Sequence, residues 1–154
     1  MRQVRQNVFE TNSSSTHSIC VTKNNILDNK VDEIYFRLDE FGWEYSILST
    51  VDEKAAYLYT GLMSNEDYSL LDNVKKILDR NKIEYDFQDK DSTYYYVDHS
   101  YELCDFLNDV CNDEDKLMRY LFSSESFVIT ANDNDCYDID ICVDYEHDEY
   151  YKDN

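Results

Sequence analysis

Basic residues are scarce in this chain. Its 14 lysines and arginines face 34 aspartates and glutamates, which leaves a net charge of −20 over 154 residues. A protein that grips DNA or RNA through phosphates needs the opposite sign, so the composition disfavours a direct nucleic-acid ligand. The charge favours a basic protein surface as partner, for example that of a nuclease or another protein that itself binds nucleic acid.

The chain also lacks any apolar run close to the ~18 residues that a membrane span requires. Residues 1–10 are polar and show no apolar core of a signal peptide. The five cysteines are odd in number and have no CxxC spacing. We therefore expect reduced thiols in a bacterial cytoplasm, with no membrane partner and no cofactor.

Proline is absent, and glycine and alanine are rare, whereas Asn, Asp, Tyr and Ile are abundant. This usage is typical of AT-rich coding and favours a low-GC bacterium or one of its phages as the source. A hydrophobic fraction of 42%, with 15 tyrosines, is too high for a disordered acidic tail. The length suits one domain over residues 1–154 with a proper core.

The charge is distributed unevenly along the chain. Residues 1–83 hold 13 acidic and 10 basic residues, whereas residues 84–154 hold 21 and 4, so the net charges are −3 and −17. Self-repulsion at this density costs stability, and solubility alone would need far less of it. We interpret the acidic half, 84–154, as the part that makes the functional contact.

Apolar periodicity predicts grouped strands and helices. The clearest helical stripe is formed by Leu70, Leu71, Val74, Ile77 and Leu78. Strands are expected at 18–23, 33–38, 44–49, 83–87, 94–97, 126–131 and 133–145, and helices at 52–60, 64–82, 103–111 and 113–122. Thr50 or Ser49 should cap the first helix, which Gly61 should end; Ser64 should start the second helix, and Asn112 should cap the last. Segment 39–43 should be a turn, and the tail from 146 should fray. This grouping favours an α+β fold, with a mostly antiparallel sheet and helices packed on one face.

Segment 133–145 alternates apolar residues with acids, so a strand there would hold a row of carboxylates outward. Alternate residues lie roughly 6.7 Å apart on one face, close to the spacing of phosphates along a nucleic-acid strand. This geometry predicts a phosphate mimic that inhibits a nucleic-acid-binding partner. The predicted partner-binding carboxylates are Asp133, Asp135, Asp138, Asp140, Asp144 and Glu146, with Asp113, Glu114 and Asp115 as a second patch.

The polar segment 13–18 leaves a different function open, that of an enzyme or nucleotide-handling protein. Its hydroxyls surround His17, but the Gly-x-Ser-x-Gly elbow and the P-loop signature are absent. We expect instead a structured loop whose side chains bond to the backbone. A third alternative is a structural or interaction domain without mimicry.

Metal-binding patterns are weak. Asp133 and Asp135 resemble the start of a calcium loop, but Asp138 and Asp144 stand where glycine and glutamate are required. The cysteine and histidine spacings match no zinc knuckle, and Cys111 falls on an apolar helix face. We expect no metal site.

Segment 7–18, NVFETNSSSTHS, resembles the N-terminal signature of a group of small uncharacterised proteins from low-GC bacteria and their phages. That resemblance covers about 12 residues and implies kinship without an assigned activity. By acidic character and size, the chain is also similar to phage anti-defence proteins. Many anti-CRISPR inhibitors are acidic α+β proteins that occupy the DNA-binding cleft of a nuclease, so this similarity implies the same kind of role.

Overall fold

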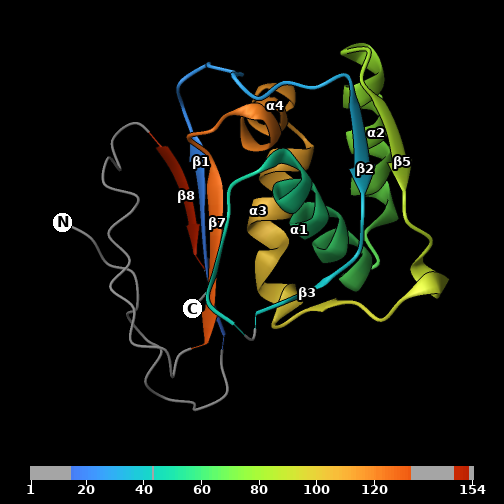
Figure 1. Ribbon diagram of the computed structural model, residues 1–154, viewed down its shortest axis with the longest axis vertical. Helices are drawn as coiled ribbons and strands as arrows, with labels where there is room; N and C mark the ends of the chain where they lie inside the picture. Colours follow the sequence, from blue (N-terminus) through green and yellow to red (C-terminus); the bar gives the residue numbers. More distant parts are fainter. Residues whose placement is uncertain (1–14, 43, 133–147, 153–154) are drawn as a thin grey trace.

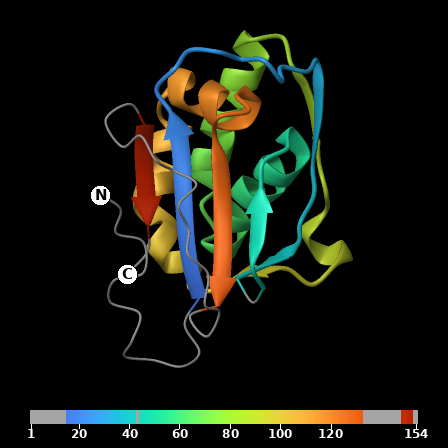
Figure 2. The same cartoon turned by 60° about the vertical axis from the view of Figure 1, so that its left-hand side comes forward.

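A four-stranded antiparallel sheet forms one side of the molecule (Figures 1 and 2). The computed structural model describes residues 15–42, 44–132 and 148–152. The strand order in the sheet is β4 (Ser46–Leu48), β7 (Phe127–Asn132), β1 (Ser15–Thr22), β8 (Asp148–Lys152). The two longest strands, β1 and β7, therefore occupy the centre, where both of their edges are paired.

The described residues form four α-helices, which lie on one side of this sheet and fill the middle of the molecule (Figure 1). They are α1 (Val51–Ser64), α2 (Tyr68–Arg80), α3 (Cys104–Cys111) and α4 (Glu114–Phe122). Two 3-10 turns, Lys90–Ser92 and Ser100–Leu103, connect the later elements. The predicted α+β class, with a mostly antiparallel sheet and helices on one face, is confirmed.

Two short parallel strand pairs lie on the other side of the helices. One pair is β2 (Glu33–Phe36) with β5 (Glu84–Phe87), and the other is β3 (Glu40–Phe41) with β6 (Tyr96–Val97). Helix α1 therefore lies between the large sheet and β2, and every residue from Lys54 to Met63 is buried. A helix that is buried on all sides needs small or apolar residues around its whole circumference, which the run AAYLYTGLM largely provides.

The helix boundaries between 50 and 80 correct two predictions, the helix end at Gly61 and the helix start at Ser64. Of the two predicted N-caps, Ser49 and Thr50, it is Thr50 that caps α1, and Gly61 does not end the helix, which continues to Ser64. Gly61 is instead a packing residue, because an added Cβ would lie 3.2 Å from Leu103 Cδ1. The next helix begins only after Asp67, whose side chain caps it by accepting from the backbone N–H of Leu70.

The five apolar residues of the α2 stripe are all buried, which confirms that interpretation. In the later helices, Asp113 and not Asn112 is the N-cap of α4, because its side chain accepts from the backbone N–H of Lys116. The predicted core position of Cys111 is confirmed, since that side chain is fully buried.

Three strand predictions were wrong in extent. Segment 15–18 was predicted to be loop but belongs to β1, where Ser15 pairs with Asn132 and Ser18 with Ile129. The tail was predicted to fray, yet β8 pairs with the other edge of β1. Glu40 and Phe41 form a strand inside a predicted turn, because β6 lies alongside them. In each case the backbone hydrogen bonds go to a distant strand, which local patterns do not reveal.

None of the helices that the structure describes is long and apolar enough to cross a bilayer. The predicted acidic strand 133–145 lies outside the described residues.

Candidate functional site

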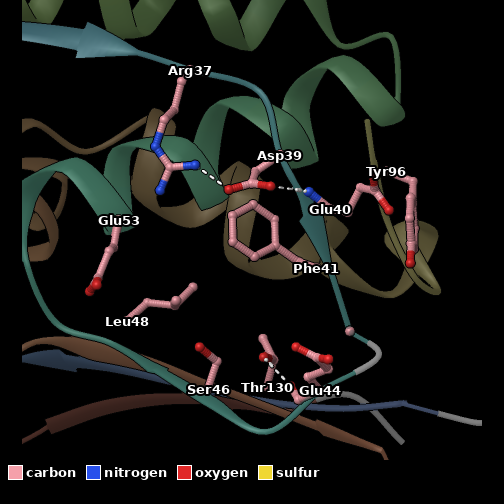
Figure 3. A pocket seen from close by; sticks show the side chains of 11 residues that line it. Arg37, Asp39, Glu40, Phe41, Glu44, Ser46, Leu48, Glu53, Tyr96 and Thr130 are labelled. Carbon is pink, nitrogen blue, oxygen red and sulfur yellow. Dashed lines mark hydrogen bonds and ion pairs between the residues drawn. The ribbon is translucent and has the colours of Figure 1, made fainter. Parts of the chain in front are cut away.

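An acid-lined cavity of about 500 Å³ opens between β3, β4 and the start of α1 (Figure 3). Its walls come from five strands or helices and from the segment that follows β2. The lining residues that carry charge are Arg37, Asp39, Glu40, Glu44 and Glu53, and the others are Phe41, Gly42, Ser46, Leu48, Tyr96 and Thr130. The cavity lining therefore holds four carboxylates and one guanidinium.

The local sequence explains how the cavity forms. The backbone N–H of Asp39 donates to Thr60 Oγ1 at 3.2 Å, which holds the segment against α1. Glu40 then pairs with Tyr96 in the short parallel ladder. Gly42 has φ of +116°, a conformation that L side chains rarely adopt, and it turns the chain from β3 toward β4. Because glycine tolerates this conformation, the chain can turn here, and the turn forms part of the cavity wall.

Two of the four carboxylates are already engaged by the protein. Asp39 pairs with Arg37 and also accepts from the backbone N–H of Glu40 at 2.9 Å (Figure 3). Glu53 Oε2 accepts from the backbone N–H groups of Ser49 and Thr50 at 2.9 and 3.2 Å, completing the capping box of α1.

The carboxylates of Glu40 and Glu44 are different. Within the described part of the chain, neither has a hydrogen-bond donor or a cation as partner; Glu44 contributes only its backbone carbonyl, which accepts from Thr130 Oγ1 at 3.2 Å. Two uncompensated negative charges beside the rings of Phe41 and Tyr96 make this cavity suited to a cation.

A second cavity, of about 420 Å³, shares Tyr96 with the first. We call it the tyrosine cavity; its lining is Met63, Ser64, Glu66, Tyr68, Lys90, Tyr95, Tyr96, Val97 and Ser100. Met63 and Val97 form a buried apolar part, whereas Tyr68 is 45% exposed at the rim. Because Tyr96 borders both spaces, the two cavities are neighbours along one edge of the molecule.

His17 and Ser18, the described side chains of the polar segment 13–18, lie in the core and line neither cavity. His17 is fully buried, and its Nε2 donates to the carbonyl of Asp98 at 2.9 Å. Nδ1 must therefore accept, and it receives the hydroxyl of Tyr57 at 2.8 Å. Burial lowers the pKa of His17 to about 4, so the ring is neutral near pH 7. A neutral ring with both nitrogens engaged and no exposed atom does not support a general base for an external substrate.

Lys54 is a second buried polar group, in the first turn of α1. Its Nζ donates to the backbone carbonyls of Ser123 at 2.7 Å and Ser126 at 3.0 Å. Burial lowers the pKa of Lys54 to about 8. The backbone carbonyl of Lys54 in turn accepts from the hydroxyl of the buried Tyr120 at 2.7 Å. These bonds tie α1 to α4 and to the turn before β7, so Lys54 has a structural role.

The predicted partner-binding residues fall into two groups. Asp133, Asp135, Asp138, Asp140, Asp144 and Glu146 lie outside the described residues, so their arrangement stays a prediction. The second patch is described.

Two acids of the second patch have structural partners. Asp113 caps α4, and Glu114 pairs with Arg80 Nη2 at 2.8 Å while its other oxygen accepts from Asn81. The hydrogen bond from Arg80 lowers the pKa of Glu114. Asp115 is exposed and, among the described residues, has no such contact.

Acids greatly outnumber bases in the described part of the acidic half, and most of these acids are exposed. Residues 84–132 contain 12 acidic and 3 basic residues, and none of the 12 acids is buried. Of the three cations, Lys116 pairs with Asp109 at 2.8 Å and Arg119 donates to the carbonyl of Thr22. Most of these carboxylates therefore face water without an opposite charge.

Sequence patterns did not single out Glu40, Glu44 or Tyr96 as site residues, and they marked Ser64 only as a helix start. The one weak signal is for Tyr96, because the run 94–96 places three tyrosines together between acidic residues. The two cavities bring together residues up to about 90 positions apart, a proximity that periodicity cannot predict.

Metal and thiol chemistry receive no support within the described ranges. There, no three His, Cys, Asp or Glu side chains cluster as metal ligands. Cys20 and Cys111 are buried free thiols, and Cys104 is an exposed one. Burial raises the pKa of Cys111 far above its usual value, which keeps it an unreactive thiol.

Comparisons with protein-family models, with curated proteins and with solved structures gave no match. The features of this chain therefore define its class. It is a strongly acidic α+β protein, and its described part has two adjoining cavities at one edge.

Proposed function

We propose that the protein is an acidic binding protein whose partner presents a basic surface, and that it inhibits the binding of nucleic acid to that partner. The observation that carries the proposal is the acid-lined cavity, with its two uncompensated carboxylates, on a chain with a net charge of −20. A cationic side chain of the partner would enter this space and pair with Glu40 and Glu44. The biological setting that this chemistry suits is the bacterial cytoplasm, where a phage-related protein would inhibit a nucleic-acid-binding nuclease in the manner of an anti-CRISPR protein.

The distribution of charge supports a docking role over a purely structural one. Cations of the described chain are mostly committed to its own surface: Arg80 to Glu114, Lys116 to Asp109, and Lys75 over the ring of Phe87 at 5.3 Å. Exposed like charges destabilise the folded state, and the carboxylates of Glu40, Glu44 and Asp115 make no contact among the described residues that would offset this cost. A partner of opposite charge would relieve this repulsion on binding.

The enzyme or nucleotide-handling alternative has less support. It depends on residues 13–18, of which His17 and Ser18 are buried and line neither cavity. A phosphate ligand is disfavoured at the acid-lined cavity because its carboxylates would repel it.

The proposal is tested by capture and competition. The full chain is immobilised and exposed to a bacterial lysate at 50 mM and 500 mM salt, with and without duplex DNA. We expect a basic, nucleic-acid-binding protein to be retained at low salt, and to be released by salt or by DNA, because exposed charges are screened within about 8 Å at physiological ionic strength. The purified partner should then lose DNA binding, measured by fluorescence anisotropy, as the chain is added.

Matched variants locate the contact. Glu40→Gln with Glu44→Gln should weaken the complex at least tenfold, and the triple change Asp138→Asn, Asp140→Asn, Asp144→Asn tests the predicted acidic strand in the same assay. The control removes two charges elsewhere, Asp72→Asn with Glu84→Gln, and should have a much smaller effect. A retained protein that is indifferent to salt and DNA, or no retained basic protein at low salt, would refute the proposal.

A further inference from the structure

We infer that the tyrosine cavity is an anchor site for an arginine side chain of the basic partner, inserted among Tyr68, Tyr95 and Tyr96. The inference rests on the proposed function, because it takes the ligand to be part of a basic protein surface. The inference names the partner residue that anchors the complex, an arginine. It also gives the partner a second binding position on this chain.

The cavity wall already holds a cation of this chain. Lys90 Nζ lies 5.6 Å from the centroid of the Tyr68 ring and donates to the Tyr68 hydroxyl at 3.2 Å. An ammonium at that distance from a ring face is attracted by the quadrupole of the ring. Lys90 is exposed and reaches the rim from a 3-10 turn. The position of Lys90 thus shows that the Tyr68 ring accommodates a positive charge. Because the Lys90 side chain is flexible, an incoming arginine can displace its ammonium from the ring.

The end of α1 adds negative potential to the same space. Helix α1 ends at Ser64, its last turn contains no basic residue, and the adjoining Glu66 lines the cavity. The carbonyl end of a helix carries a partial negative charge, which favours a cation nearby. The α1 terminus and Glu66 therefore both draw a positive group into this cavity.

A buried hydroxyl supplies an acceptor that the fold does not use. Ser64 Oγ is inaccessible to water and has no hydrogen-bond partner within the described part of the chain. A buried polar atom left without a partner costs free energy, which a ligand donor would recover. Ser64 lines the tyrosine cavity, so rotation about its Cα–Cβ bond would turn this hydroxyl toward a donor bound there.

These features suit arginine better than lysine or an apolar side chain. A guanidinium is planar and weakly hydrated, stacks on aromatic faces, and offers five donors to acceptors in different directions. An apolar group would leave Ser64 Oγ unpaired, and a compact ammonium would stack poorly. Tyr96 also borders the acid-lined cavity, so a neighbouring basic residue of the partner could reach Glu40 and Glu44.

The test uses the full chain and a defined probe, Nα-acetyl-arginine amide, in an NMR titration of ¹⁵N-labelled protein at low salt. Saturable shifts are expected at the amides of residues 63–68 and 95–97. The neutral isostere Nα-acetyl-citrulline amide should give no saturable shifts, and Nα-acetyl-lysine amide should bind more weakly than the arginine probe. Equal binding of the citrulline probe, or shifts confined to other residues, would overturn the inference.

Variants of the chain sharpen the result. Tyr68→Leu should raise the dissociation constant for the arginine probe about fivefold, because it removes a cation–π face. Lys90→Met should lower it, because it removes the competing cation. The control is Tyr101→Leu, since Tyr101 is 65% exposed and lines neither cavity. Unchanged affinity in Tyr68→Leu would refute the anchor.

The two proposals can fail separately. A chain that captures a DNA-competed basic partner but ignores the arginine probe would keep the proposed function and lose this anchor site. A chain that binds the arginine probe at the tyrosine cavity but captures no basic partner would keep the site and lose the proposed function.

Discussion

Two regions of this protein treat polar groups in opposite ways. In the core, each nitrogen of His17 and the ammonium of Lys54 has an acceptor or donor supplied by the fold. At the cavity edge, the carboxylates of Glu40 and Glu44 have no partner among the described residues. A buried polar group needs a hydrogen-bond partner within the protein, whereas a group that faces solvent can bind water until a ligand replaces it. The difference separates structural residues from candidates for binding, although both sets are polar.

The largest effect should come from acidifying the core. Unfolded His17 binds a proton near pH 6.5, but in the fold its pKa is about 4. The unfolded state therefore holds more protons between these values, and stability falls as pH falls through that window. Relative to a His17→Gln variant, the parent should lose about 3 kcal/mol between pH 6.5 and 4. Urea unfolding of both proteins across this range measures it; parallel curves would show that His17 is not buried neutral.

A single core hydroxyl should matter less. Tyr57→Phe removes the hydroxyl that donates to His17 Nδ1 at 2.8 Å. We expect a loss of about 2 kcal/mol in the free energy of unfolding, because a buried acceptor loses its donor. Tyr101→Phe, at a 65% exposed position, is the matched control and should change stability by less than ~0.5 kcal/mol. Equal effects of the two changes would remove the distinction between core and surface.

The second acidic patch contains both kinds of residue. Asp113→Ala should cost about 1 kcal/mol, because it removes the N-cap of α4. Asp115→Ala, two positions on and exposed, should cost almost nothing. Thermal melts of the two variants make the comparison. A destabilised Asp115→Ala protein would mean that this carboxylate also has a structural contact.

The smallest effect on stability is expected at the acid-lined cavity. Glu40→Gln with Glu44→Gln removes two uncompensated charges, so the free energy of unfolding should stay within ~0.5 kcal/mol of the parent or rise slightly. Chemical denaturation checks this, and the same protein should show weakened partner capture. A large loss of stability would place both carboxylates among the structural residues.

Local sequence determined much of this fold. The α2 stripe, the apolar face of α3 and the Thr50 cap were predictable because each depends on residues within a few positions of one another. The α+β class followed from the grouping of these segments. The excess of acid in the second half was equally plain, since charge is a property of composition.

The tertiary structure decided the rest. Segment 15–18 became part of a central strand because β7 offers it a hydrogen-bonding edge, and β8 formed because β1 offers another. Gly61 was read as a helix end until the contact with Leu103 showed its packing role. Whether a polar group is buried and hydrogen-bonded depends on neighbours from distant segments. Tyr57 and Asp98 bond to the buried ring of His17. Glu40 and Glu44 line a cavity instead. Burial and satisfaction are properties of three-dimensional surroundings, so no pattern along the chain could assign them.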